Sequence, residues 1–245
     1  MKCGTQIRIL LIRHGETAGN LEKRYVGRTD EELCSAGRQK MERIRKEGGG
    51  YFREQETSCR LPDSVKAVFA SPMKRCIQSA EILFPGIQLR TIPDMQECDF
   101  GEFEYKNYAE LSEDIRYQEW IGSGGTKGFP GGEEPDAFRA RICIAFENMV
   151  DEILQTQTCS AGEGRHGEDP DFVYALVCHG GCIMAIMDTF AQPHRDYFDW
   201  QLKNGQWLEI CLDLEKWSRG EKTLYLAGDE KHCFLKIDPL HFIIT

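Results

Sequence analysis

The chain has 245 residues, of which 41% are hydrophobic and 10% aromatic, which is enough to bury the core of one α/β domain or of two small ones. Its formal net charge of -10 disfavours nucleic acid and anionic membrane surfaces as partners, so an anion site would need a local group of cations. The best apolar runs are too short or too interrupted to cross a bilayer, which excludes a membrane-spanning protein.

The first predicted element is a buried strand over residues 7–12, because this run is continuously apolar and partly β-branched, as is typical of a parallel sheet covered on both faces. It ends at Arg13-His14-Gly15. Thr17 is suited to cap a short helical turn, and Ser35 a helix that runs to about residue 46, before three consecutive glycines.

A second buried strand is predicted over residues 65–70, followed by Ser71-Pro72 and a helix that ends near Leu83. Residues 53–64 are polar and are interpreted as a connector, and a short strand is expected over residues 88–92. The region of about 93–134 is rich in charge, aromatic residues and glycine, which predicts an inserted lid with one or two helices around residues 108–121.

Pro135 begins the most regular helical pattern, because apolar residues then recur at intervals of three and four. The polar residues 156–171 predict a mobile loop. A third buried strand, over residues 172–178, ends at His179-Gly180-Gly181 and is followed by an apolar helix to about Ala191.

Alternating patterns over residues 206–214, 223–226 and 233–237 predict antiparallel edge strands near the C-terminus. No internal repeat is visible. We therefore expect residues 1–245 to form a single α/β domain, with three α/β/α layers, a mostly parallel central sheet and the inserted lid.

Cationic or ionisable side chains follow all three predicted buried strands: Arg13 and His14, then Arg75, then His179. Because the carboxyl ends of parallel strands share one edge of a sheet, we expect these four side chains to converge. Two arginines suit a phosphate dianion, and a neutral histidine can attack phosphorus while the other histidine donates to the developing charge. The residues alone do not say which histidine attacks.

A leaving alkoxide also needs a proton, and the candidate donors lie in the predicted lid: Asp94, Glu97, Asp99, Glu102 and Glu104. The pattern alone does not choose among them. Whichever acts must have a raised pKa, so the site must be covered.

Each of these signals has a simpler explanation when taken alone. Arg75 could be a solvated helix residue, His179 a structural histidine, and Asn20 a local cap in place of a phosphate ligand. Cys178, His179 and Cys182 could suggest zinc, but no second Cys or His pair lies nearby in the sequence. We expect no metal and no cofactor.

The same residues carry a resemblance to the histidine phosphatase superfamily, the phosphoglycerate-mutase-like fold. Its signature is similar to residues 11–17 with Asn20, and further blocks in family order cover nearly the whole chain: residues 27–30, 70–75, 97–104, 131–133 and 178–181. The resemblance implies that His14 is the nucleophile that becomes phosphohistidine, with Glu97 as proton donor. It also implies that Arg13, Arg75 and His179 clamp the phosphoryl group, assisted by Asn20.

The chain departs from the family pattern at two places. Tyr105 stands where relatives usually have a glycine, so a bulky side chain occupies a position where backbone freedom is expected. Val26 stands where relatives often place a polar group that faces the substrate. The short lid and the His-Gly-Gly block resemble the broad-specificity and α-ribazole phosphatase branch more than true mutases.

We therefore expect a metal-independent phosphatase that hydrolyses a small-molecule phosphomonoester. The alternatives are a phosphoglycerate-mutase-type phosphotransferase and a non-catalytic phosphate-binding regulatory module. A cytoplasmic location is expected, because the N-terminus lacks a secretory pattern and the eleven cysteines are odd in number and scattered.

Overall fold

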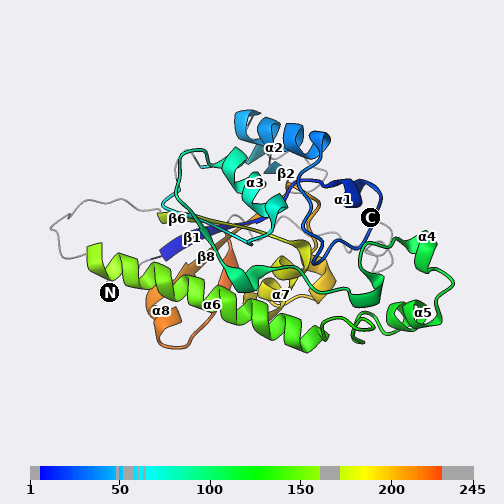
Figure 1. Cartoon of the computed structure of the whole chain (residues 1–245). Coiled ribbons are helices and arrows are strands. Elements are labelled where there is room, and N and C mark those ends of the chain that lie inside the picture. The colour runs from blue at the N-terminus through cyan, green and yellow to red at the C-terminus, as the bar shows by residue number, and fades with distance from the viewer. Residues whose placement is uncertain are drawn as a thin grey trace.

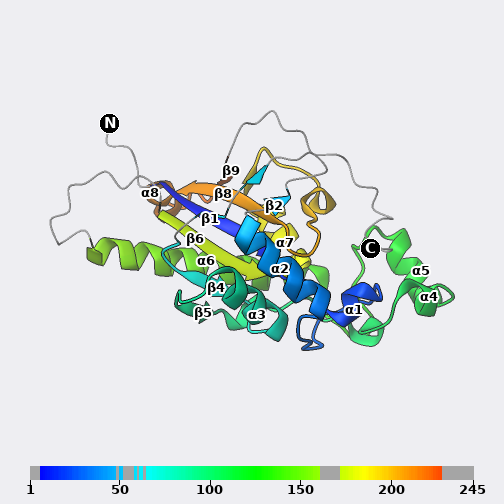
Figure 2. The same ribbon diagram turned by 90° about the horizontal axis from the view of Figure 1, so that it is seen from above.

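The largest sheet of the computed structural model has its strands in the order β5-β4-β6-β1-β8-β9-β7, and most of them can be followed in Figure 2. The structure describes residues 6–47, 50–51, 58–59, 61–62, 65–160 and 172–227. The strands of this sheet are β1 (Gln6–Arg13), β4 (Val68–Ala70), β5 (Leu89–Thr91), β6 (Phe172–Cys178), β7 (Ala191–Gln192), β8 (Trp207–Asp213) and β9 (Leu224–Leu226).

Strand β1 lies at the centre of the sheet, as its apolar run predicts. It pairs in parallel with β6, where Ile9 faces Tyr174, and antiparallel with β8. Its residues Ile7 and Ile9 to Ile12 have no exposed surface. Strand β6 has the predicted bounds, whereas β4 spans three residues and not six. The prediction of a mostly parallel central sheet is thus confirmed.

Helices cover both faces of this sheet, which gives three layers (Figure 1). Helices α2 (Ser35–Glu47) and α3 (Lys74–Leu83) pack on the face that carries Leu10 and Ile12. Helices α6 (Pro135–Ser160) and α7 (Gly180–Phe190) pack on the face that carries Ile9 and Leu11. Successive residues of β1 therefore supply the two cores in alternation, as the pleat of a strand requires.

Helix α6 is longer than predicted. It extends to Ser160, so the expected loop over residues 156–171 begins at least five residues too early. Its buried side chains hold the helix on the sheet and include Phe138, Ile142, Phe146, Met149 and Ile153. Residues 161–171 lie outside the described part of the chain.

The predicted lid contains two 3-10 turns, η1 (Pro93–Met95) and η2 (Gly101–Phe103), and two helices, α4 (Tyr108–Leu111) and α5 (Ile115–Gly122). These helices lie beside the short helix α1 (Ala18–Leu21) at one end of the molecule (Figure 1). Four lid residues form a small core together with Tyr25, which lies after α1: Phe103, Leu111, Tyr117 and Trp120. Most of the lid's aromatic side chains therefore pack against one another.

Short strands account for the remaining differences from prediction. Strand β3 (Ser58–Cys59) lies within the expected connector and pairs antiparallel with β2 (Gly50–Tyr51), a pairing that the polar composition of residues 53–64 did not indicate. Strands β8 and β9 form the antiparallel side of the sheet, as predicted. The two-residue strand β7 comes directly after α7 and pairs in parallel with β9. Residues 233–237 lie outside the described part. Helix α8 (Leu214–Ser218) and the turn η3 (Tyr197–Trp200) complete the described elements.

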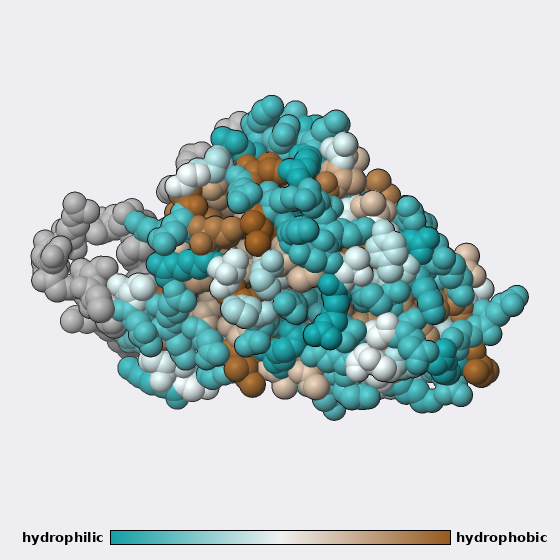
Figure 3. Space-filling model, viewed as in Figure 1, coloured by the Kyte–Doolittle hydropathy of each residue, from teal (hydrophilic) through white to brown (hydrophobic). Residues whose placement is uncertain are grey.

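Hydrophilic side chains cover most of the face shown in Figure 3, where hydrophobic residues reach the surface only in small patches. Among the described residues, no helix has both the length and the apolar character needed to cross a membrane.

Two isoleucines on α6 test the placement of this helix. Ile142 has no exposed surface, whereas Ile144 leaves 57% of its surface exposed. Ile142→Ala is expected to lower the free energy of unfolding by about 2–5 kcal/mol, because it removes buried methyl groups and leaves a cavity. Ile144→Ala, the matched control, is expected to change it by less than about 0.5 kcal/mol. Urea denaturation measures both values, and equal losses would contradict the orientation of α6.

Candidate active site

The three loops that carry the predicted site residues are joined by backbone hydrogen bonds at the carboxyl ends of β1, β4 and β6. The His14 N–H donates to the Cys178 carbonyl at 3.0 Å, and the Ser71 N–H donates to the Val177 carbonyl, also at 3.0 Å. The imidazole rings of His14 and His179 meet edge to face, with their centroids 5.2 Å apart. The predicted convergence at one sheet edge is therefore what the structure shows.

His14 is 3% exposed and its ring is held in one orientation. Its Nδ1 lies 2.7 Å from the Gly15 carbonyl oxygen, which can only accept, so Nδ1 carries the proton and Nε2 carries the lone pair. Nε2 makes no hydrogen bond to the described residues. Burial, with the positive charges of Arg75 and Arg13, lowers the pKa of His14 well below its usual value. The ring is thus neutral, with a free nitrogen, at neutral pH.

A cavity of about 100 Å³ lies in front of this ring. Arg13, Asn20 and Glu97 are among the residues that line it, whereas Arg75 and His179 are not. This volume is several times the space that one water molecule needs, so it can hold a phosphoryl group. The site therefore presents a histidine, a carboxyl group, cationic side chains and amide groups to a ligand; Lys23, Arg24 and Gln201 complete its polar lining.

Arg13 and Asn20 both have hydrogen-bond donors left over for that ligand. The Arg13 side chain donates from Nη1 to the Leu202 carbonyl at 2.5 Å, but its buried Nε has no partner among the described residues. The Asn20 amide oxygen accepts from the Thr17 N–H, which completes the cap of α1, while the amide nitrogen makes no such bond. A buried unpaired donor such as Arg13 Nε is unfavourable, so an anion that bound it would stabilise this arrangement.

Glu97 also lines the cavity and contacts the N-terminal turn of α7. Its Oε2 accepts from the Gly181 N–H at 3.2 Å, and its Oε1 from the Cys98 N–H at 3.0 Å. Burial raises the pKa of this carboxyl group, against the opposing effect of the two N–H donors and the arginines. A Cβ atom at Gly181 would lie 2.4 Å from Glu97 Oε1, so only glycine permits this approach.

Arg75 and His179 lie behind the cavity, and other groups of the protein occupy their polar atoms. Arg75 has no exposed surface and donates to the Thr29 carbonyl at 2.7 Å and to the Gly27 carbonyl at 2.8 Å. Its Nε donates to His179 Nδ1 at 3.3 Å, and His179 Nε2 lies 2.7 Å from Ser71 Oγ. The proton of His179 is therefore on Nε2, and this ring would have to turn to reach a phosphoryl group.

Burial and the neighbouring charge of Arg75 also lower the pKa of His179 well below its usual value. The two histidines thus lie beside two arginines in one small region, and both imidazoles are neutral there. Their predicted roles in binding and catalysis remain predictions.

Sequence reasoning missed several residues that hold this site together. Asn204 donates to the His14 carbonyl at 3.1 Å and to the Asn20 amide oxygen at 3.2 Å. Ser79 Oγ accepts from the Gly15 N–H at 2.9 Å. The Asn204-Gly205 pair indicates a turn, but nothing in the sequence indicates that this turn lies against His14.

The other predicted proton donors are engaged outside the cavity. Asp99 pairs with Arg28, Glu102 pairs with Arg116, and Asp94 is exposed. Glu104 binds a backbone loop, because its Oε1 accepts from the N–H groups of Gly27 and Thr29, both at 2.9 Å. Glu97 is therefore the candidate that the structure places at the cavity.

Both departures from the family pattern have structural consequences. Tyr105 adopts a left-handed backbone with a φ of 60°, where glycine is favoured, which confirms the expected need for backbone freedom. Its hydroxyl donates to Glu31 at 2.7 Å, and Arg24 lies over its ring. Val26 lines the cavity, so an apolar group faces the ligand there.

The zinc alternative involved Cys178, His179 and Cys182. His179 bonds to Arg75 and Ser71, and burial raises the pKa of both thiols well above their usual value, which disfavours the thiolate form that binds zinc. Within the described ranges, no three His, Cys, Asp or Glu side chains are arranged to hold a metal ion.

Comparison with known proteins places the chain in a family. A family model described as the histidine phosphatase superfamily (branch 1) matches residues 9–221. The uncharacterized phosphatase PhoE of Bacillus subtilis is 33% identical over 212 residues, which cover 85% of this chain and 90% of PhoE. A broad-specificity phosphatase of Saccharomyces cerevisiae is 27% identical over 184 residues, which cover 74% of this chain and 69% of the yeast protein.

Solved structures agree on the fold. The alpha-ribazole phosphatase from Shigella flexneri matches with a TM-score of 0.63 at 19% identity, over 94% of this chain and 100% of that one. The chain is a three-layer α/β protein that has a cationic cavity at the carboxyl ends of its parallel strands. It belongs to the histidine phosphatase superfamily. The family and the names of these relatives support an activity of phosphatase or mutase type.

The protonation of the two histidines can be tested directly. An ordinary histidine, with a pKa of about 6.5, gains a proton as the pH falls through that value. We expect His14 and His179 to stay neutral at pH 6.5 and to charge only at lower pH, because both pKa values are lowered. Nitrogen-15 NMR should find the proton of His14 on Nδ1 and that of His179 on Nε2. A protonated Nε2 on neutral His14 would contradict the assignment of its free nitrogen.

Proposed function

We propose that this protein is a phosphatase that hydrolyses a small-molecule phosphomonoester through a phosphohistidine on Nε2 of His14. The observation that carries the proposal is the state of this ring: it is buried and neutral, it is held through Nδ1 with Nε2 left free, and it lines a cavity that Arg13 and Glu97 also line. A fixed, uncharged imidazole beside an unpaired guanidinium donor suits attack on a phosphate dianion.

In the first step, His14 Nε2 forms a bond to phosphorus as the bond between phosphorus and the leaving oxygen breaks. Glu97 gives its proton to that oxygen, so the leaving group departs as an alcohol. The raised pKa of Glu97 favours the protonated form that this step needs, and the negative charge of a bound phosphate would favour it further. Arg13 balances the charge on the phosphoryl oxygens.

In the second step, water attacks the phosphohistidine while Glu97 accepts a proton from it. The bond between Nε2 and phosphorus breaks, inorganic phosphate leaves, and both His14 and Glu97 return to their starting forms. Arg75 and His179 would join the phosphoryl oxygens only if His179 turns away from Ser71. No metal ion or cofactor enters either step.

Two other functions remain as alternatives. A mutase would hold the phosphohistidine long enough to return the phosphoryl group to a bound product, and a regulatory module would bind phosphate without turnover. The proposed location is the cytoplasm, which rests on the scattered, odd-numbered cysteines of the sequence.

The nucleophile is tested by His14→Ala. With a generic aryl phosphate and a chelator present, the unchanged protein should release phosphate and form an acid-labile phosphoenzyme. His14→Ala should lose at least about a thousandfold in turnover, because the covalent route is closed. Rapid quenching with radiolabelled substrate measures both quantities. Chelator-sensitive turnover would contradict metal independence, and transfer of the label to phosphoglycerate faster than to water would favour the mutase.

The acid is tested by Glu97→Gln. Turnover of an alkyl phosphate should fall by about 10²–10⁴-fold, because its leaving oxygen needs a proton, whereas turnover of 4-nitrophenyl phosphate should fall much less. Glu102→Gln is the matched control, since Glu102 pairs with Arg116 on the lid surface. Steady-state rates on both substrates measure the difference. Equal slowing of the two would remove Glu97 from this role.

A further inference from the structure

Lys23 is a cavity residue that the proposed mechanism does not use. It follows the C-terminal end of α1 and lines the same cavity as His14 and Glu97. Its backbone has a φ of 56°, the left-handed conformation that glycine adopts without strain and other residues adopt at a cost. A lysine is thus kept at a position where glycine would be more stable, which is a feature often found at functional sites.

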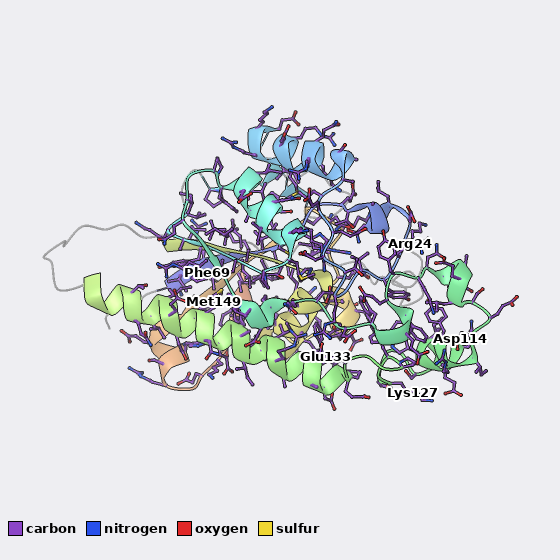
Figure 4. All side chains as sticks on the ribbon, in the orientation of Figure 1. Arg24, Phe69, Asp114, Lys127, Glu133 and Met149 are labelled. Atoms are coloured by element: carbon purple, nitrogen blue, oxygen red, sulfur yellow. The ribbon has the colours of Figure 1, made fainter. Side chains whose placement is uncertain are left out.

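The charge of Lys23 is not balanced within the described part of the protein, where no acidic side chain pairs with it. The next residue, Arg24, lies between α1 and the lid (Figure 4) and is neutralised by Glu22 at 2.6 Å and Glu110 at 2.7 Å. Among the described residues, Glu97 is the one acidic residue that lines the cavity. The wall that carries Lys23 therefore has an available positive charge.

Apolar side chains line the same cavity as Lys23. Tyr25 and Val26 are less than 10% exposed, line the cavity and offer packing surface, together with Phe100 of the lid. Valine cannot form a hydrogen bond to the ligand. Apart from Arg13, Lys23 is the cation of the lining that has no acidic partner among the described residues, and the apolar residues suit a short hydrocarbon or ring.

We infer that the leaving group of the substrate carries a second anionic group, a carboxylate or a phosphate, that binds Lys23. This inference rests on the proposed function, because it assigns the substrate class of the same cavity. The phosphoryl group to be transferred lies at His14 and Arg13, the body of the leaving group packs on Val26 and Phe100, and its anion pairs with Lys23.

Matched substrates test this inference. Phenyl phosphates with a para carboxylate or a para carboxamide have the same shape and differ in charge, and a para phosphate distinguishes the two anions. In the unchanged protein, kcat/KM should be about tenfold higher for the carboxylate than for the carboxamide, as expected for a charge-assisted hydrogen bond. Lys23→Gln should abolish this ratio through KM, Lys23→Arg should retain it, and added salt should reduce it.

Two further variants separate recognition from folding and from net charge. Lys23→Gly removes the charge and relieves the left-handed backbone, so it should abolish the ratio without loss of thermal stability. Lys127→Gln is the control for net charge, because Lys127 pairs with Glu119 on the exposed lid surface and lies at the lower edge of the lid in Figure 4. This control should keep the ratio.

A ratio near one in the unchanged protein, or a ratio that Lys23→Gln leaves intact, would overturn the inference while the phosphatase proposal stands. Binding of benzylphosphonates with para carboxylate or para carboxamide groups, measured by calorimetry, does not depend on turnover. If no phosphomonoester is hydrolysed but the carboxylate still binds about tenfold more tightly through Lys23, the anion site stands and the phosphatase proposal fails.

Discussion

The hydrogen bond from His14 Nδ1 to the Gly15 carbonyl is the interaction on which the site depends. It fixes the proton on one nitrogen, so the other nitrogen is free for chemistry. The hydrogen bond orients the ring only if the backbone at His14 and Gly15 is itself fixed. Three hydrogen bonds fix it: Ser79 Oγ accepts from the Gly15 N–H, and Asn204 and Gly205 both donate to the His14 carbonyl. A neutral imidazole then results from burial beside two arginines, because charging it there would require desolvating a third cation.

The sheet provides the geometry for this arrangement. Parallel pairing of β1 with β6 and of β4 with β6 brings three loop starts to one edge, and helix α7 begins there with two glycines. The absence of a side chain at Gly181 lets the carboxyl group of Glu97 approach the helix terminus, where an N–H group orients it. The proposed proton donor, Glu97, and the proposed nucleophile, His14, therefore come from different segments, one from the lid and one from the end of β1, yet backbone atoms orient both.

Much of this could be predicted, and the limits have physical causes. The apolar runs specify β1 and β6 and the periodic pattern specifies the start of α6, because burial on defined faces leaves a clear signature. The convergence of His14 and His179 follows from topology alone. The contacts of Asn204 could not be predicted, because they depend on tertiary approach of a turn. Likewise, the sequence does not show that Arg75 and His179 form hydrogen bonds to other protein groups and do not line the cavity, because local packing decides the orientation of a side chain.

The loop of residues 26–29 is held by opposite charges on its two sides. Glu104, from the lid, accepts from its N–H groups, and Arg75, from α3, donates to its carbonyl groups. Removing either side chain would leave peptide groups of this loop without hydrogen-bond partners. The loop would then be held less firmly against the charged side chain that remains. In evolution the two positions are therefore constrained jointly: a lineage could replace one of them only if it also rebuilt the loop, so Glu104 and Arg75 should vary together among relatives.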